Sequence, residues 1–469
     1  MFWFDFNWQI QQFLIQFWWQ INFLLLVILV IIGYLAYKKP IYALGLTIVL
    51  LPTYLFRSYV WFLPFTFLEL CIWVTFLGWL FAKMSSRGGS TEQNDETISK
   101  EIASPRSRIG ARNDTKLIDW LWPIILILLT STISLLIAPD WPAAAGLWKA
   151  YFIEPLLFFL VLTNVLKNDK DKEIILWSLG LATLVVSLLA IYQKFTGFGI
   201  AEPGWVGADH RRVTSIFTSP NAVGLYLGPI VMIYLSWLIA EVKNVRRSIL
   251  KILILTPALL AILFTLSQGT WLGMLAAAIF LGYFARPAEA GRSGGWNKKW
   301  TTIIVALAVI LVLLVPTARN IVWPTLTFQD AAGQNRLVLL QMSQQYLLEN
   351  PKNFVLGAGI FGFSQIQNQL REPLKMEALL YPHNIIFNFW LEIGLLGLAA
   401  FGWLIIKFFK AGATSYQLPT TNYRWLTLGL MAAMIVILVH GLVDVPYFKN
   451  DLAILFWIII GLANQDYRG

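Results

Sequence analysis

One of the three histidines in this 469-residue chain is placed for proton transfer. His383 and Asn384 come directly after a long polar stretch and directly before a long apolar run. A neutral imidazole at the boundary between water and lipid could accept the proton of a sugar hydroxyl near neutral pH. The structural alternative is an interfacial histidine whose ring is satisfied by the backbone. The sequence has no His-Glu-x-x-His pattern and no Cys/His cluster, so we expect no metal site and no cofactor.

Three arginines in two other parts of the chain could bind phosphate. Arg211 and Arg212 lie between a short loop and an apolar run, and Arg336 lies in the polar stretch before His383. A guanidinium group stays charged and donates two parallel hydrogen bonds to phosphate oxygens. The alternative is that these arginines are interfacial anchors that contact lipid headgroups. The residue types alone do not separate these two interpretations.

The residues after Arg336 predict an amphipathic helix. Apolar side chains at Leu339, Met342 and Tyr346 recur every three or four residues, and Asn350-Pro351 predicts the end of the helix. The glycines at 357 and 359 then interrupt the chain. No Lys-Ser/Thr pair follows them, so they predict a tight turn that returns the chain to the membrane and not a phosphate loop.

Further ionisable groups lie in or near apolar runs, where charge is costly and usually has a partner. His440 and Asp444 are one helical turn apart, which predicts either an ion pair or a helix cap. Glu154 follows Lys149 by five residues. That spacing predicts a structural ion pair, and the alternative role is contact with a substrate.

The elements that position these residues are apolar helices. Hydrophobic residues make up 58% of the chain and charged residues only 13%, whereas a soluble domain is about a quarter charged. Apolar runs of about 17–25 residues recur along the chain. We therefore predict an all-α polytopic membrane protein with 12–14 transmembrane helices and one long external loop that contains an amphipathic helix. Thirteen spans are expected, at about 20–37, 41–56, 61–82, 118–138, 150–166, 174–192, 216–240, 252–268, 270–285, 301–316, 384–406, 425–443 and 452–465.

The spans divide the chain into six segments that differ in composition. They are an interfacial N-terminal segment (1–19), transmembrane helices (20–82), a disordered cytoplasmic loop (83–117), transmembrane helices (118–316), the external loop (317–383) and transmembrane helices (384–469). The loop at 83–117 is polar, rich in Gly and Ser and mixed in charge, which is typical of a flexible linker.

The distribution of basic residues predicts the orientation. Alternate loops place 24 of the 35 lysines and arginines on one side of the membrane and 11 on the other. By the positive-inside rule the first side is cytoplasmic, so the N-terminus and the loop at 317–383 are outside and the C-terminus is cytoplasmic. In a membrane protein such charge sets the orientation, and we expect the bilayer, not nucleic acid, as its partner.

Several short motifs together resemble the O-antigen ligase/polymerase family. They are the stretch from Arg212 to Asn221, Ser267-Gln268-Gly269, Arg336 at the start of a helix, Asn350-Pro351 with Gly357-Ala358-Gly359, Pro382-His383-Asn384 with Leu391-Glu392, and the stretch from His440 to Asp444. The matches cover residues 145–465 in the family's order. One departure is Gln268, because many members have an arginine at that position.

The resemblance implies a polytopic glycosyltransferase of the GT-C kind in the bacterial cytoplasmic (inner) membrane. Its donor would be a polyprenyl-diphosphate-linked glycan, and its acceptor a glycan, a lipid or a protein. By the family's pattern two external arginines bind the diphosphate and the loop histidine is the base, which corresponds to Arg212, with Arg211 as the neighbouring alternative, Arg336 and His383. Asn221, Glu154, Asn384, His440 and Asp444 are expected to support the site.

Two questions stay open at the level of sequence. Ligation to lipid A core, polymerisation of repeat units and transfer to a protein hydroxyl share this architecture within the family. A lipid or glycan transporter or flippase is the alternative of a different class. A transporter is expected to carry ionisable residues in the middle of the membrane, whereas in this chain they gather at the external face.

Overall fold

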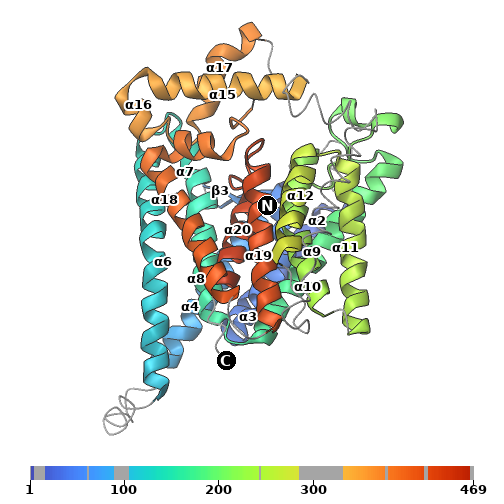
Figure 1. Cartoon of the computed structure of the whole chain (residues 1–469), viewed down its shortest axis with the longest axis vertical. Coiled ribbons are helices and arrows are strands. Elements are labelled where there is room, and N and C mark those ends of the chain that lie inside the picture. The colour runs from blue at the N-terminus through green and yellow to red at the C-terminus, as the bar shows by residue number, and fades with distance from the viewer. Residues whose placement is uncertain are drawn as a thin grey trace.

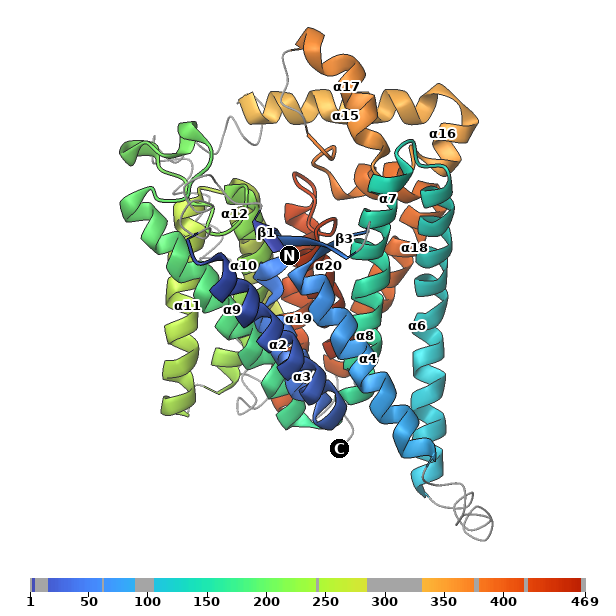
Figure 2. The same cartoon turned by 180° about the vertical axis from the view of Figure 1, so that it is seen from behind.

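The computed structural model of the chain describes residues 2–4, 16–60, 63–88, 105–241, 244–284, 331–374, 379–416 and 421–464. Most of these residues form a bundle of helices along the long axis of the molecule, and a separate layer of helices lies across one end (Figure 1, Figure 2). The bundle helices are α2 (Trp18–Lys38), α3 (Pro40–Val49), α4 (Phe67–Gly88), α6 (Pro105–Leu136), α7 (Trp141–Trp148), α8 (Glu154–Val165), α9 (Asp169–Thr196), α10 (Pro220–Ala240), α11 (Val245–Thr265), α12 (Gln268–Phe284), α18 (Ile385–Tyr416), α19 (Thr421–His440) and α20 (Asn450–Ala463). A π-helical turn, η2 (Lys149–Ile153), joins α7 to α8.

The helical content confirms the prediction of an all-α polytopic membrane protein. Within the described residues, seven helices have the length and hydropathy of a membrane span, and five further apolar helices are shorter. Together they account for twelve of the thirteen expected spans. The thirteenth, at 301–316, lies outside the described residues.

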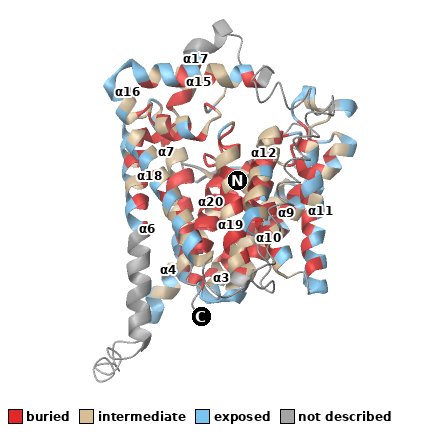
Figure 3. Cartoon of the chain, in the orientation of Figure 1, coloured by how far each residue is buried: buried red, intermediate tan, exposed pale blue. Residues whose placement is uncertain are grey.

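Helix α10 forms the centre of one half of the bundle, packed against α9, α11, α12 and α19. It is buried along most of its length, whereas outer helices such as α11 expose apolar side chains on one face (Figure 3). Its start follows from its sequence, because the Ser219 hydroxyl accepts a hydrogen bond from the Ala222 amide and Pro220 occupies the first turn.

The N-terminal part of the chain differs from the expected spans. Three short strands, β1 (Phe2–Phe4), β2 (Phe56–Val60) and β3 (Leu63–Thr66), form an antiparallel sheet in the order β1-β2-β3. The expected spans at 41–56 and 61–82 therefore meet at a hairpin, and α4 begins at Phe67. Thr66 and Glu69 explain this start, since each side chain accepts a hydrogen bond from the other residue's backbone N–H and together they cap the helix.

The segment predicted as a disordered loop, 83–117, is partly helical. Helix α4 continues to Gly88 and α6 begins at Pro105, while residues 89–104 lie outside the described residues. The polar composition did not predict this extension. An apolar helix that is already formed adds one hydrogen bond for each residue it gains, so it can continue into polar sequence at little cost.

Helices α15 (Ala331–Glu349), α16 (Pro351–Leu356) and α17 (Gly362–Leu374) form the layer that lies across the bundle (Figure 1). The helix predicted after Arg336 is α15, which begins earlier than expected, at Ala331, so that Arg336 lies in its second turn. Leu339 and Met342 are buried, as the predicted period requires. The Asn350 side chain accepts a hydrogen bond from the Asn353 amide and caps α16. The predicted end of the first helix and the position of the Asn-Pro pair are therefore confirmed.

The layer is attached to the bundle where α18 is interrupted. Ile393 and Gly394 have non-helical backbone angles, and the turn after α16 packs against this break. The Ala358 amide donates to the Leu391 carbonyl at 2.7 Å, and the Phe361 amide donates to the Glu392 carboxylate at 2.9 Å. The glycine turn and the Leu391-Glu392 motif are thus two halves of one contact.

We predict that Gly394→Ala weakens this attachment. Gly394 has φ = +75°, and a Cβ there would lie 2.6 Å from the Val355 carbonyl oxygen. Such strain should lower the free energy of unfolding by about 1–3 kcal/mol. Thermal unfolding in detergent and limited proteolysis of residues 331–374 would measure it.

Gly402→Ala is the matched control in the same helix, because no atom lies within 4 Å of its added Cβ. Alanine is the better helix former, so this variant should be neutral or slightly more stable. Equal melting temperatures and equal cleavage for the two variants would contradict the prediction that Gly394 is needed to attach the layer to α18.

Candidate functional site

His383 contacts an acidic residue from another part of the chain. Its Nδ1 lies 3.2 Å from Oδ1 of Asp444, and the imidazole is 29% exposed. Burial alone would raise the pKa of Asp444, but the charge and hydrogen bond of His383 lower that pKa well below its ordinary value. The ionised carboxylate can accept a hydrogen bond from Nδ1–H of His383, and in the neutral tautomer with its proton on Nδ1 the other ring nitrogen, Nε2, is the acceptor.

The backbone around His383 orients this ring. His383 has φ = +52°, a left-handed conformation that few residues with a side chain adopt. Directly after it, Asn384 caps α18 by accepting hydrogen bonds from the Ile386 and Phe387 amides. Asn384 also donates to the Leu442 carbonyl at 3.0 Å, in the same loop as Asp444. Asn384 therefore connects the start of α18 to the loop that carries Asp444.

His440 does not form the predicted pair with Asp444. The Asp444 carboxylate faces His383, and the buried His440 ring lies 3.4 Å from the Thr270 hydroxyl, next to Gly269. The reason is that α19 ends at His440, so Asp444 lies beyond the last helical turn and one-turn spacing no longer applies. The pairing of Asp444 with His383 was not visible from their separation in sequence.

The structure distinguishes between the two neighbouring arginines. The Arg211 side chain donates to the carbonyl oxygens of Val206 and Lys194, at 2.8 and 2.9 Å, so it is a structural link within its loop. Arg212 donates through Nε to the Thr265 carbonyl at 2.9 Å and stacks over the Trp205 ring. Neither terminal nitrogen of Arg212 donates to any described residue.

Arg336 lies on α15, near enough to Arg212 for the two charges to interact. Its side chain is half-buried and makes no hydrogen bond or ion pair with the described residues. Burial lowers the pKa of the Arg212 guanidinium, and the nearby positive charge of Arg336 lowers that pKa further. The two arginines, from distant parts of the chain, are therefore close enough for their charges to interact, and each has N–H donors with no partner among the described residues.

Two comparisons with known proteins bear on the resemblance found in the sequence. The sequence model of the O-antigen ligase family matches residues 252–402, from α11 to the middle of α18. The O-antigen ligase of Salmonella typhimurium is 23% identical over 319 residues, which are 63% of this chain and 70% of that protein. Both matches support the resemblance to the O-antigen ligase family. This likeness supports a role in glycan transfer during the assembly of O-antigen or a related polysaccharide.

Arg336 and His383 lie inside the region matched by the O-antigen ligase model, while Arg212 and Asp444 lie outside it. The match also contains Gln268, where the family resemblance predicted an arginine. Gln268 begins α12, one residue after the buried Ser267.

A glutamine that the sequence did not single out holds the Arg212 segment in place. Gln193, fully buried near the end of α9, accepts hydrogen bonds from the Thr214 and Ser215 amides and donates to the Ser215 carbonyl. Ser215 has φ = +52°, so this segment leaves the regular backbone just after Arg212. No short motif signals such a contact, because it joins residues about twenty positions apart.

The remaining expected residues have mainly structural surroundings. Lys149 lies 3.6 Å from Glu154, as predicted, and only 2.6 Å from Glu69 of α4. The Trp73 indole donates to Glu154 at 3.0 Å. Asn221 is half-buried in the first turn of α10, beside the Ser219 cap. Among the described residues no three His, Cys, Asp or Glu side chains form a metal-binding group, and a metal-free reaction stays a prediction.

We predict that Gln193→Leu destabilises the protein by about 2 kcal/mol or more. It leaves two backbone N–H groups and one carbonyl unpaired in the interior, at about 1–3 kcal/mol each. Gln193→Glu retains the two acceptor contacts and should be intermediate. Thermal unfolding in detergent would measure both changes.

The control is Gln345→Leu, at an exposed position of α15. It should leave the melting temperature unchanged. If Gln193→Leu also melted at the wild-type temperature, the glutamine would not hold the Arg212 segment.

Proposed function

We propose that this protein transfers a glycan from a polyprenyl-diphosphate carrier to an acceptor hydroxyl at the outer face of the bacterial cytoplasmic (inner) membrane. The observation that supports it best is the His383–Asp444 pair on the same side of the bundle as Arg212 and Arg336. The His383–Asp444 pair suits an acceptor O–H, and the two arginines suit a diphosphate. Lipid, glycan and protein acceptors would all supply the same hydroxyl chemistry.

In the proposed step the acceptor oxygen attacks the anomeric carbon of the donor sugar. A new glycosidic C–O bond forms while the bond from that carbon to the diphosphate breaks, and its electron pair leaves with the diphosphate. The hydroxyl proton moves to Nε2 of His383, which gains a positive charge. Asp444 stabilises that charge and keeps Nδ1 protonated throughout.

The two arginines act on the leaving group. Negative charge develops on the diphosphate as the bond to the sugar breaks, and fixed cationic donors stabilise it. Arg212 is held by Thr265 through Nε, so its two terminal nitrogens remain available. Arg336 approaches from the helical layer on the other side. This arrangement neutralises a diphosphate with side chains of the chain itself.

The orientation of the protein is part of the proposal. The layer of α15–α17, which we propose is external, lies at the end of the bundle opposite the starts of α9 and α11 (Figure 2). The loops at that opposite end belong to the side with 24 of the 35 basic residues, which the positive-inside rule assigns to the cytoplasm. The N-terminus would be outside and the C-terminus in the cytoplasm.

We predict that His383→Ala reduces glycan transfer by roughly 10²–10⁴-fold without loss of folded protein, because it removes the base. Asp444→Asn should also reduce kcat, since a neutral amide stabilises the imidazolium poorly. A purified enzyme with a lipid-linked glycan donor would give both rates.

Glu349→Gln, at the exposed end of α15, is the carboxylate control and should turn over at the wild-type rate. Transfer by His383→Ala at the wild-type rate would remove the histidine from the mechanism. Normal transfer by Asp444→Asn would show that its carboxylate is not needed.

We also predict that Arg212→Lys and Arg336→Lys each slow transfer by roughly tenfold or more. A lysine retains the charge but not the paired donors, and one charged hydrogen bond is worth about 1.5–3 kcal/mol. The loss should appear in kcat/KM for the lipid-linked donor. Arg246→Lys, at an exposed position near the start of α11, is the control. If both site variants behaved like this control, the arginines would be anchors for the membrane surface.

A further inference from the structure

A second polar pocket lies at the end of the bundle opposite the α15–α17 layer. It has a volume of about 110 Å³ and lies between the start of α9, the end of α10 and the start of α19. Its wall includes Asp169, Lys172, Glu173, Glu241, Trp237 and Trp425. Since α10 spans 21 residues at about 1.5 Å each, this pocket is roughly 30 Å from the Arg212 region. It is a separate site.

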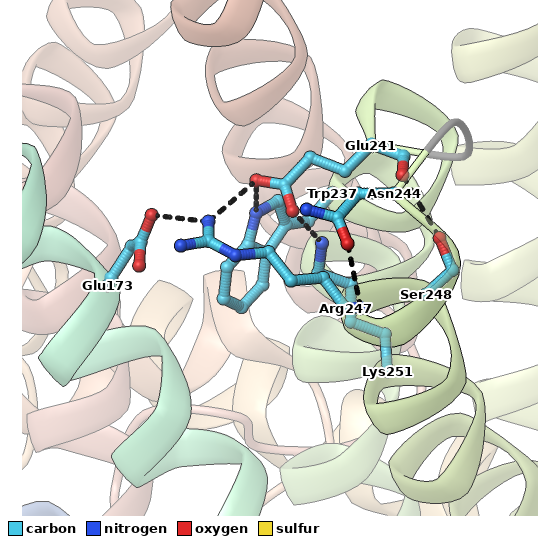
Figure 4. Close-up of polar contacts among 7 residues, drawn as sticks. All are labelled: Glu173, Trp237, Glu241, Asn244, Arg247, Ser248 and Lys251. Carbon is cyan, nitrogen blue, oxygen red and sulfur yellow. Dashed lines mark hydrogen bonds and ion pairs between the residues drawn. The ribbon is translucent and has the colours of Figure 1, made fainter.

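One side of the pocket is built around the Glu241 carboxylate. Oε2 accepts a hydrogen bond from the fully buried Lys251 at 2.7 Å, and Oε1 accepts one from the Trp237 indole at 2.9 Å (Figure 4). Lys251 also lies 4.2 Å from the centre of the Trp237 ring. With its oxygens occupied, Glu241 fixes the indole that lines the pocket.

The other side of the pocket is formed by the start of α9. Arg247 donates to Oε1 of Glu173 at 2.9 Å, and Oε2 of Glu173 has no partner among the described residues (Figure 4). Lys172 lies 3.4 Å from the Asp169 carboxylate, and its side chain is only 9% exposed whereas that of Asp169 is 63% exposed. The ammonium of Lys172 and the second carboxylate oxygen of Glu173 thus lie within one helical turn of α9.

The surroundings of the pocket suit a lipid. Two indole rings line it, and Trp side chains are common where lipid headgroups meet the hydrocarbon layer. Leu176 and Leu426 complete the lining, and the nearby helix ends expose Ile239 and Ile249. An acyl chain could follow this apolar surface while the headgroup occupies the polar part.

We propose that this pocket binds the headgroup of an aminophospholipid, with the phosphate at Lys172 and the primary ammonium at Glu173. The charges of the pocket are complementary to a zwitterion. An anionic headgroup without an amine would meet the carboxylates of Asp169, Glu173 and Glu241. A quaternary ammonium has the right charge but no N–H to donate to Oε2 of Glu173. Phosphatidylethanolamine meets all of these requirements.

The test uses the full-length protein, delipidated in detergent and incubated separately with phosphatidylethanolamine, phosphatidylcholine or phosphatidylglycerol. Native mass spectrometry counts the bound lipids. We expect roughly tenfold tighter binding of phosphatidylethanolamine than of either other lipid, the factor that one charged hydrogen bond gives. Equal binding of the three lipids, or tighter binding of phosphatidylglycerol, would overturn the proposal.

Variants locate the binding. Glu173→Gln should reduce the preference for phosphatidylethanolamine over phosphatidylcholine, and Lys172→Gln should weaken binding of both. Lys170→Gln, an exposed position on the same turn that does not line the pocket, is the matched control and should bind as the wild type does. If Glu173→Gln and Lys172→Gln kept the wild-type selectivity and affinity, the lipid would bind elsewhere and the proposal would fail.

This inference does not depend on the proposed glycan transfer. The binding measurement needs no donor, no acceptor and no assumption about which leaflet faces the pocket. A protein that transferred glycan but did not prefer phosphatidylethanolamine would refute only the lipid site. A protein that preferred this lipid but did not transfer glycan would refute only the proposed reaction.

Discussion

The contact between the turn after α16 and the break in α18 is the constraint on which the rest of the site depends. A helix can be interrupted within a membrane protein only where other protein groups cover the exposed backbone. Here the turn covers it, through the amides of Ala358 and Phe361 and the indole of Trp390, which donates to the Phe354 carbonyl at 2.6 Å. Helix α18 begins beside His383, so this contact fixes α15 and His383 to the same helix.

Much of the fold could be predicted from the sequence because a bilayer simplifies the problem. Long apolar runs must become helices there, so composition and length were enough to find twelve helices of the described chain. The amphipathic helix after Arg336 was equally readable, because its period and the Asn350-Pro351 stop are local signals. Helical periodicity and helix caps involve residues that are close in sequence, and these helices depend mainly on such local signals.

The parts that the sequence did not predict depend on contacts between distant residues. Asp444 pairs with His383 across 61 positions, and Gln193 holds the segment after Arg212 across 21 and 22 positions. The hairpin at 56–66 interrupts an apolar region, where aromatic and β-branched residues favour a strand as well as a helix. In each case the sequence shows the residue types. It does not show which distant residue contacts them in the folded bundle.

The two arginines show why the attachment of the layer and the proposed chemistry are physically linked. Arg212 is partly desolvated and feels the charge of Arg336, so holding both guanidinium groups in one region raises the free energy of the empty site. The contacts at the break in α18, together with the buried Leu339 and Met342, hold α15 in place against that repulsion. A bound diphosphate would reverse the sign of the interaction, because its negative charge attracts both groups. In the proposed mechanism the repulsion between the two guanidinium groups would be replaced by the attraction of both to the anion, which already fixed donors stabilise without rearrangement.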